Sequence, residues 1–234
     1  MNLPEHVVII PDGNRRWAKE KSRPFYFGHR EGAKRVEEVI KSAFDLKIHC
    51  LTVWGCSVNN LKDRGEIEVS FLFRLFEKMF SKLIHSKTVF REKVKVDVLG
   101  KWREVFPRNL KKITEKVVEK TKNHDGSHLT FLMAYSGTDE MMKTVESISN
   151  LKAENPKLAV NEKLIKENLW TRELPPVDLV IRTGGEPHWS AGLMMWDIAE
   201  AQFYFTKVLW PDFSAEEFKK ALDYYSKTER RFGK

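Results

Sequence analysis

The feature that most constrains the fold is an alternation of short apolar segments with longer amphipathic ones. Val, Ile, Leu and Phe dominate six strand-like segments, over residues 7–10, 48–56, 94–99, 129–135, 177–181 and 203–205. Helical periodicity occupies most of the intervals, over residues 31–46, 66–86, 109–122, 139–151, 161–168, 193–199 and 215–231. Strands separated by helices predict an α/β fold with a mostly parallel sheet that is covered on both faces.

Polar clusters follow four of the predicted strands. They read "PDGNRRW" after the first strand, "SVNNLKDR" after the second, "SGTDE" after the fourth and "RTGGEPHWS" after the fifth. In open parallel sheets, ligands bind beyond the carboxyl ends of the strands. The sequence therefore predicts a single site where these four clusters meet.

The first cluster has the chemistry of a phosphate site. Gly13 allows a sharp turn and close approach of the backbone, and the amides that follow open toward a helix N-terminus, which attracts anions. Arg15 and Arg16 are suited to phosphate oxygens, and Asp12 is suited to Mg²⁺ bound together with substrate phosphates. A capping turn with surface arginines stays open as the alternative. Neither a Walker A nor a GxGxxG sequence is present, so an ordinary nucleotide fold has no support.

The remaining clusters offer further candidates. His29 precedes a helix expected to begin near Glu31, where it could meet a phosphate and pass a proton, or simply pack or cap. Arg182 ends an apolar strand, which is costly unless the guanidinium is paired or bound to a ligand. The other candidates are also common in ordinary turns: Ser57, Asn59, Asn60, Arg64, Gly184, Gly185, His188 and Ser190.

The predicted helix over residues 66–86 is apolar on more than one stripe. A helix that faces one core needs an apolar arc of only a little over about 100°. Two interpretations stay open. Either the helix is buried between the sheet and a neighbour or dimer partner, or its extra face lines an apolar cavity.

Composition and charge narrow the class of protein. The chain has 234 residues, of which 41% are hydrophobic, so a sizeable core is expected. The net charge of +8 favours an anionic partner, namely nucleic acid, a membrane surface or a phosphorylated small molecule. On one strand, Cys50 and Cys56 would lie roughly 20 Å apart, too far for a disulfide. With no recognisable signal peptide and no apolar run of about 18 residues, a cytoplasmic location is expected.

Six motifs together resemble the cis-prenyltransferases, the undecaprenyl diphosphate synthase family. They are "HVVIIPDGNRRWA", "GHREGAKR", "LTVWGCSVNN", "DLVIRTGGE", "FYFTKVLWPDF" and "ERRFG", in the family's order from His6 to Gly233. The resemblance implies one catalytic domain over residues 1–234, with a six-stranded, mainly parallel sheet, flanking helices and a hydrophobic tunnel. It also implies a homodimer, possible peripheral membrane contact, and Mg²⁺-dependent condensation of isopentenyl diphosphate with an allylic diphosphate.

The resemblance also implies residue roles. Asp12 corresponds to the catalytic aspartate that positions Mg²⁺, His29 to the family's histidine, and Asn60 to a proposed proton acceptor. Gln202 takes the position of a second metal ligand. The tail at Arg231 resembles one that reaches the partner subunit's site. The implied substrate-binding residues are Gly13, Asn14, Arg15, Arg16, Trp17, His29, Ser57, Val58, Asn59, Arg64, Arg182, His188, Trp189 and Ser190.

Several positions depart from the family pattern. Gln202 and Asn59 replace glutamates, and Gln is a weaker Mg²⁺ ligand than a carboxylate. Phe25 stands where an arginine usually binds diphosphate, with Arg23 close but out of place, and His188 replaces a second arginine. Further departures are Leu61, Ala134, Ser136 and Thr138.

The main prediction is an active prenyl diphosphate synthase with an altered site. Irregular, lavandulyl-type coupling of two allylic diphosphates is the first alternative, and a non-catalytic partner subunit is the second. The intact Asp-Gly-Asn sequence at residues 12–14 argues against a non-catalytic role. Nucleic-acid binding is not favoured, because no recognised module is present.

Overall fold

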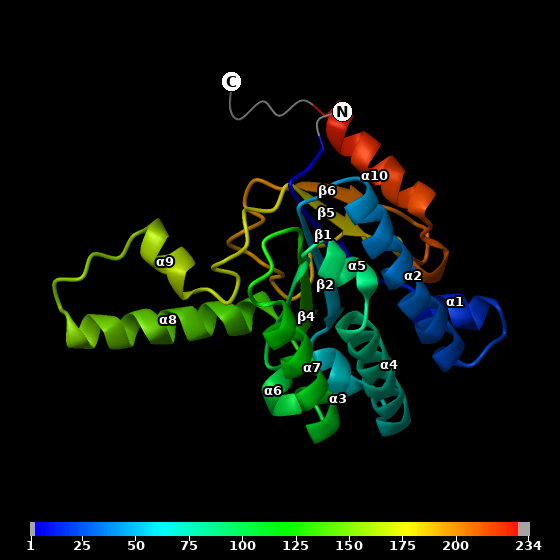
Figure 1. Cartoon of the computed structure of the whole chain (residues 1–234), viewed down its shortest axis with the longest axis horizontal. Helices are drawn as coiled ribbons and strands as arrows, with labels where there is room; N and C mark the ends of the chain where they lie inside the picture. The colour runs from blue at the N-terminus through cyan, green and yellow to red at the C-terminus, as the bar shows by residue number, and fades with distance from the viewer. Residues whose placement is uncertain (1–2, 229–234) are drawn as a thin grey trace.

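The computed structural model describes residues 3–228 and contains one six-stranded sheet (Figure 1). All strand pairs are parallel, in the order β3-β4-β2-β1-β5-β6. This confirms the predicted fold class and all six strands to within two residues at each end. The strands are β1 (His6–Ile10), β2 (Cys50–Cys56), β3 (Lys95–Leu99), β4 (His128–Met133), β5 (Leu179–Arg182) and β6 (Gln202–Phe205).

Helices lie in every connection between consecutive strands except that from β5 to β6, and two more follow β6. They are α1 (Asn14–Glu20), α2 (Phe25–Asp45), α3 (Val58–Asp63), α4 (Glu66–Ile84), α5 (Lys87–Arg91), α6 (Trp102–Val105), α7 (Arg108–Thr121), α8 (Gly137–Glu154), α9 (Glu162–Asn168) and α10 (Ala215–Lys227), together with the 3-10 helix η1 (Trp210–Asp212). No helix among the described residues is long and apolar enough to span a membrane.

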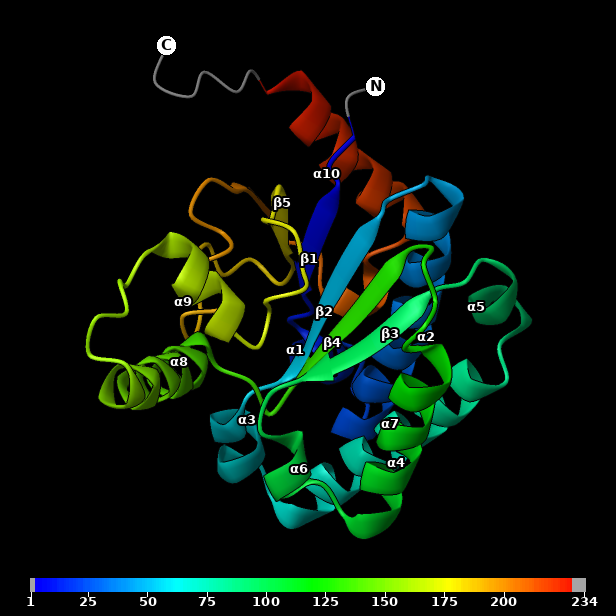
Figure 2. The same cartoon turned by 60° about the vertical axis from the view of Figure 1, so that its left-hand side comes forward.

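Four helices bury one face of the sheet. Alternate strand residues such as Val7, Leu51 and Phe131 point to this face, because successive side chains of a strand point to opposite faces. The apolar stripes of α2, α4, α7 and α10 pack against them and form the larger hydrophobic core. Figure 2 shows α2, α4 and α7 lying together on this side of the strands.

Connecting segments cover most of the opposite face. Leu193, Met194 and Ile198 pack on β1 and β5 from a run of consecutive turns, while α8 and α9 extend to the side (Figure 2). Buried hydrogen bonds fix these segments. The Tyr135 hydroxyl donates to Glu140, and the other Glu140 oxygen accepts from the backbone of Thr171. Burial raises the pKa of Glu140 despite these bonds.

Two sequence-based expectations about helices are wrong. Residues 193–199 form turns rather than a helix, because Ala191, Gly192 and Met194 adopt positive φ angles that a right-handed helix excludes. The helix expected to begin near Glu31 begins at Phe25, so His29 lies within α2 instead of before it. The short helices α3, α5 and α6 were not predicted.

The topology brings the polar clusters that follow β1 and β5 together. Strand β1 pairs with β2 on one side and with β5 on the other, so the connections from β1 and β5 leave in opposite directions. Such a switch point opens a crevice beyond the carboxyl ends of the strands. The segments that follow Ile10 and Arg182, which are paired in register, therefore lie beside each other.

Candidate functional site

Asp12 lies at the switch point between two arginines. Its Oδ2 accepts from Nη2 of Arg182 at 3.0 Å, and its Oδ1 lies 3.1 Å from Nη2 of Arg16. The Asp12 side chain is 34% exposed, so the carboxylate remains accessible to a ligand. The Thr183 hydroxyl accepts from the Asp12 amide at 2.9 Å and donates to the Asp12 carbonyl at 2.8 Å. These bonds fix the loop that carries the carboxylate.

Arg182 is the last residue of β5 and is buried at the start of the polar cluster that follows this strand. Its side chain is only 7% exposed, and Nη1 donates to the His188 carbonyl and to the Ser190 hydroxyl. Its Nε is buried without a hydrogen-bond partner. A buried guanidinium with an unused donor is expensive in the absence of a ligand. Of the two possibilities that the sequence left open for this arginine, the structure shows a pairing with Asp12, and binding of a ligand stays a prediction.

A strongly basic pocket opens beside Asp12. We call it the basic pocket, and within the described part of the chain it gathers five cationic side chains around one carboxylate. A cavity of this charge fits a polyanion such as a diphosphate. The residues that line it are Pro11, Asp12, Gly13, Asn14, Arg15, Arg16, Lys19, Arg23, Phe25, His29 and Arg64.

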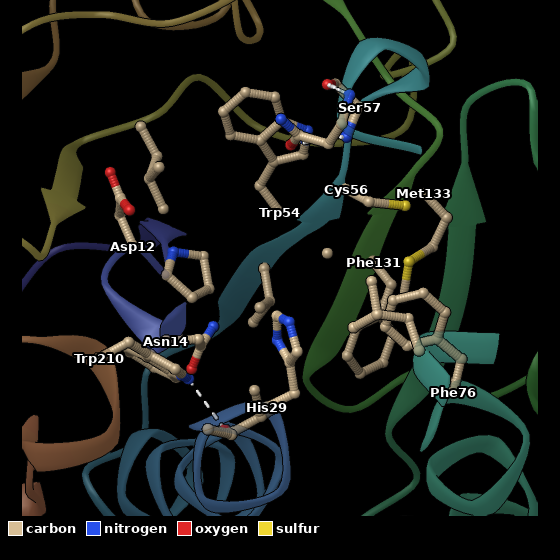
Figure 3. Close-up of a pocket in the computed structure, with 18 of the residues that line it drawn as sticks. Asp12, Asn14, His29, Trp54, Cys56, Ser57, Phe76, Phe131, Met133 and Trp210 are labelled. Carbon is tan, nitrogen blue, oxygen red and sulfur yellow. Dashed lines mark hydrogen bonds between the residues drawn. The ribbon is translucent and has the colours of Figure 1, made fainter. Parts of the chain in front are cut away.

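A second pocket, which we call the main pocket, shares Asp12, Asn14, His29 and Arg64 with the basic pocket. Its volume is about 390 Å³. Figure 3 shows Asp12 on the left of it, His29 near the middle, and the side chains of Phe76, Phe131 and Met133 together on the right. One cavity thus joins a charged end to an apolar end.

Helix α4 supplies much of the apolar wall. Leu72, Leu75, Phe76 and Met79 line the main pocket, while Phe80 packs in the core. The interpretation that one face of this helix lines an apolar cavity is therefore supported, and packing of the helix against a dimer partner stays a prediction. That the cavity continues as a long tunnel stays a prediction.

His29 and Arg64 are joined by a glutamate that the sequence analysis did not single out. His29 Nε2 donates to Oε1 of Glu68 at 2.8 Å, and Arg64 Nε lies 3.3 Å from the same oxygen. Glu68 is 8% exposed. Burial lowers the pKa of His29, and the hydrogen bond to Glu68 opposes that shift. The neutral ring would therefore carry its proton on Nε2 and leave Nδ1 unprotonated.

Ser57 and Asn60 both line the main pocket, and they also cap α3. The backbone N–H of Asn60 donates to Ser57 Oγ at 3.0 Å, and the backbone N–H of Ser57 donates to the side-chain Oδ1 of Asn60 at 3.4 Å. This reciprocal pair is a capping box. Asn59 lies on the same turn and also lines the main pocket.

Seven of the candidate residues line neither pocket: Trp17, Val58, Gly184, Gly185, His188, Trp189 and Gln202. Trp17 donates to Asp212, and Trp189 donates to the Leu193 carbonyl. The other candidates within the described residues line at least one of the two pockets, whereas no residue of the predicted "SGTDE" cluster at 136–140 lines either. The predicted tail at Arg231 lies outside the described residues.

The structure does not bring Gln202 to Asp12 within one chain. Gln202 pairs with Leu179 at the amino end of β6, whereas Phe205 pairs with Arg182. Three residues along a strand correspond to roughly 10 Å. These two residues therefore do not lie together within one chain, and their joint role in holding a metal stays a prediction. No group of three or more His, Cys, Asp or Glu side chains in residues 3–228 is placed to hold a metal ion.

Sequence comparison places this site in a known family. Residues 10–233 match the family described as "Putative undecaprenyl diphosphate synthase". The chain is 38% identical over 233 residues to an isoprenyl transferase of Thermotoga maritima, covering 100% of this chain and 98% of the relative. It is 34% identical over 238 residues to a geranylgeranyl-diphosphate-specific tritrans,polycis-undecaprenyl-diphosphate synthase of Pyrococcus furiosus, covering 99% and 88%.

Structural comparison agrees with this assignment. Lavandulyl diphosphate synthase from Lavandula x intermedia, solved with dimethylallyl diphosphate, has a TM-score of 0.90 and 29% identity, covering 99% of both chains. A probable undecaprenyl diphosphate synthase from Campylobacter jejuni has a TM-score of 0.79 and 25% identity, covering 100% of both chains. With the basic pocket and the main pocket meeting at Asp12, the chain belongs to the undecaprenyl diphosphate synthase family of prenyltransferases.

Proposed function

We propose that this prenyltransferase condenses isopentenyl diphosphate with an allylic prenyl diphosphate and releases diphosphate. The observation that carries the proposal is the junction of the two pockets at Asp12. The basic pocket suits the diphosphate of the allylic substrate, and the apolar end of the main pocket suits its hydrocarbon tail. A water-soluble mononucleotide would leave the wall formed by Leu72, Phe76 and Met79 without a complementary group.

The proposed chemistry needs little beyond placement and charge. The carbon–oxygen bond of the allylic diphosphate breaks, and diphosphate leaves with the electron pair. The isopentenyl double bond attacks the allylic carbon, and a proton is then lost. Arg15, Arg16 and Arg64 would hold the departing diphosphate, and their fixed charges would stabilise the negative charge that develops on it. Arg182 and Ser190, on the other side of Asp12, would hold the second substrate.

The residues present fit a magnesium ion that is held mainly through the substrate. Mg²⁺ in such sites keeps several waters and binds one or two carboxylates together with substrate phosphates. Asp12 is a single, partly exposed carboxylate beside the basic pocket, which matches that donor set. When bound, Mg²⁺ would supply further neutralisation of the diphosphate charge.

A second candidate reaction is irregular coupling of two allylic diphosphates. It is favoured by the TM-score of 0.90 to lavandulyl diphosphate synthase. The pocket volume of about 390 Å³ lies near the lower end of the range of roughly 300–1,000 Å³ that is usual for ligand sites, which also favours a short tail. The relatives at 34% and 38% identity are named as isoprenyl chain synthases, and their names favour the regular reaction.

The choice between the two reactions is tested by offering defined substrate pairs. Purified protein is incubated with Mg²⁺ and isopentenyl diphosphate plus dimethylallyl, geranyl, farnesyl or geranylgeranyl diphosphate, and separately with dimethylallyl diphosphate alone. Lipid extracts are analysed by mass spectrometry. We expect products in which an allylic substrate is extended by five-carbon units. Product from dimethylallyl diphosphate alone would favour irregular coupling. Folded protein that forms no product from any combination would overturn the proposed function.

A further inference from the structure

The first turns of α2 and α4 carry an exposed group of apolar and basic side chains. We call it the aromatic–arginine patch and define it as Tyr26, Phe27, Arg30, Ile67, Phe71 and Arg74. Ile67 is 79% exposed, the highest value among the exposed large hydrophobic side chains of the described residues, and Tyr26 is 40% exposed. Figure 1 shows that α2 and α4 run side by side and begin near α1 and α3.

Ring contacts join the two helix ends into one surface. The Tyr26 ring centroid lies 5.9 Å from that of Phe71 and 5.0 Å from that of Phe27. Ile67, Phe71 and Arg74 are spaced by four and three residues, so they share one face of α4. The patch is therefore continuous across α2 and α4.

Positive charge lies directly over these rings. The Arg30 guanidinium is 4.6 Å from the centroid of Phe27, and that of Arg74 is 6.0 Å from the centroid of Phe71. Arg30 also lies 3.5 Å from Glu31, whereas Arg74 has no acidic partner among the described residues. The patch thus combines apolar area with at least one cation that no acid neutralises.

The patch borders the mouth of the basic pocket. Arg23 lines that pocket, and its guanidinium lies 5.2 Å from the Phe27 ring. Phe25 lines the same pocket, and its ring is 5.8 Å from that of Tyr26. A surface bound to the patch would therefore lie beside the entrance of the site.

We infer that the aromatic–arginine patch docks the mouth of the site onto an anionic membrane surface. Aromatic and branched apolar side chains insert at the boundary between headgroups and acyl chains, and arginines attract anionic lipids. The net charge of +8 also attracts the protein to an anionic surface. The reason for docking rests on the proposed function, since that reaction makes an amphiphilic product with a tail that water does not solvate.

Vesicle binding tests the inference directly. The full-length protein is sedimented with vesicles of phosphatidylcholine that contain phosphatidylglycerol, and with vesicles of phosphatidylcholine alone. We expect binding to the anionic vesicles that weakens as salt is raised, and much weaker binding to the neutral ones. Failure of the wild-type protein to bind anionic vesicles at low salt would overturn the inference.

Two pairs of variants locate the contact. Ile67→Ser should weaken binding about tenfold, whereas Val160→Ser, at a 53% exposed position outside the patch, should not. Arg74→Gln should weaken binding more than Arg108→Gln, which removes an exposed arginine at the start of α7. Equal effects within either pair would overturn the inference, because binding would then not depend on the patch.

Two further measurements distinguish membrane docking from a contact between copies of the chain, and from failure of the proposed function. A change of oligomeric mass in Ile67→Ser, with vesicle binding unchanged, would identify the patch as an interface between copies of the chain and overturn the membrane assignment. Prenyl transfer between short substrates without lipid should be unchanged in Ile67→Ser. If the wild-type protein forms no product in that assay, the proposed function fails, while the vesicle result still stands or falls separately.

Discussion

At the scale of single residues, the Asp12 carboxylate connects the two parts of the site. One oxygen meets Arg16 from α1, and the other meets Arg182 from β5. A carboxylate held by two guanidiniums is fixed in place before any ligand arrives. The position of Asp12 therefore sets the geometry where the basic pocket and the main pocket meet.

Arg23 is expected to bind the allylic diphosphate, although its place in the sequence does not match the family's arginine. It lines the basic pocket together with Phe25, which stands at the family's usual arginine position. Loss of one charge-assisted bond to phosphate costs about 1.5–3 kcal/mol. We therefore expect Arg23→Gln to raise the KM for the allylic substrate roughly tenfold or more in steady-state kinetics. Lys21→Gln, an exposed position on the same loop, is the control, and equal KM values in both variants would contradict this role.

Glu68 is expected to control the protonation of His29. The hydrogen bond and the charge of Glu68 both raise the pKa of His29, against the larger effect of burial. Glu68→Gln keeps an acceptor but removes the charge, so the pKa of His29 should fall further. An NMR titration of the His29 ring measures this shift, with Glu66→Gln on the exposed first turn of α4 as the control. An unchanged His29 pKa in Glu68→Gln would contradict the coupling.

The sequence can reveal a functional residue when its position depends on its neighbours in the chain, and not when it depends on the packing of distant elements. Asp12, Arg15 and Arg16 follow a strand directly, so their place at its carboxyl end can be predicted from chain order. Glu68 is different, because its role depends on α2 and α4 packing together, and a glutamate in the first turn of a helix is ordinary in sequence. An acid four residues after Arg64 was the only available indication.

At the scale of elements, the close approach of α1 and α2 positions the first cluster. An ideal Cβ at Gly28 would lie 1.9 Å from the backbone oxygen of Asn14, so only glycine fits there. Gly28→Ala should force α1 and α2 apart and lower the free energy of unfolding by about 1–3 kcal/mol. Urea unfolding checks this. Gly65→Ala, where a Cβ meets nothing within 4 Å, should be close to neutral, and equal losses in both variants would contradict the packing argument.

The elements also show why some segments could be predicted and others could not. The six strands have continuous apolar runs because both faces of a parallel sheet are buried. The apolar residues of 193–199 are spaced as in a helix, but the segment forms a series of turns. The side chains of Leu193, Met194 and Ile198 pack on the sheet from these turns. Periodicity reports which side chains are buried, and it does not report the positive φ angles at Ala191 and Met194.

At the scale of the whole molecule, buried histidine links stability to pH. The His6 ring donates through Nδ1 to the Pro175 carbonyl at 2.8 Å, and its Nε2 accepts from the Thr52 hydroxyl at 2.8 Å. Burial lowers the pKa of His6 from 6.5 to about 4. Between these two pH values the unfolded chain binds a proton at His6 that the native chain does not. The contribution of the neutral ring to the free energy of unfolding is therefore complete above pH 6.5 and is lost as the pH falls toward 4.

The expected loss from His6 is on the order of 3 kcal/mol across that window. Urea unfolding at a series of pH values measures it. His6→Gln removes the titrating ring, so its free energy of unfolding should fall less steeply with decreasing pH than that of the wild type. His85→Gln, at an exposed position after α4, should keep the wild-type slope. The same slope in all three proteins would contradict the assignment.

The molecule as a whole places one carboxylate where the basic pocket and an apolar cavity meet, and prenyl transfer at Asp12 is the central claim. The most direct measurement is incorporation of ¹³C-labelled isopentenyl diphosphate into lipid-extractable product, detected by mass spectrometry in the presence of Mg²⁺. We predict labelled product from the wild-type protein and from Asp63→Asn, an exposed control, and a loss of at least about a hundredfold in Asp12→Asn. Near-normal incorporation by folded Asp12→Asn would contradict the claim.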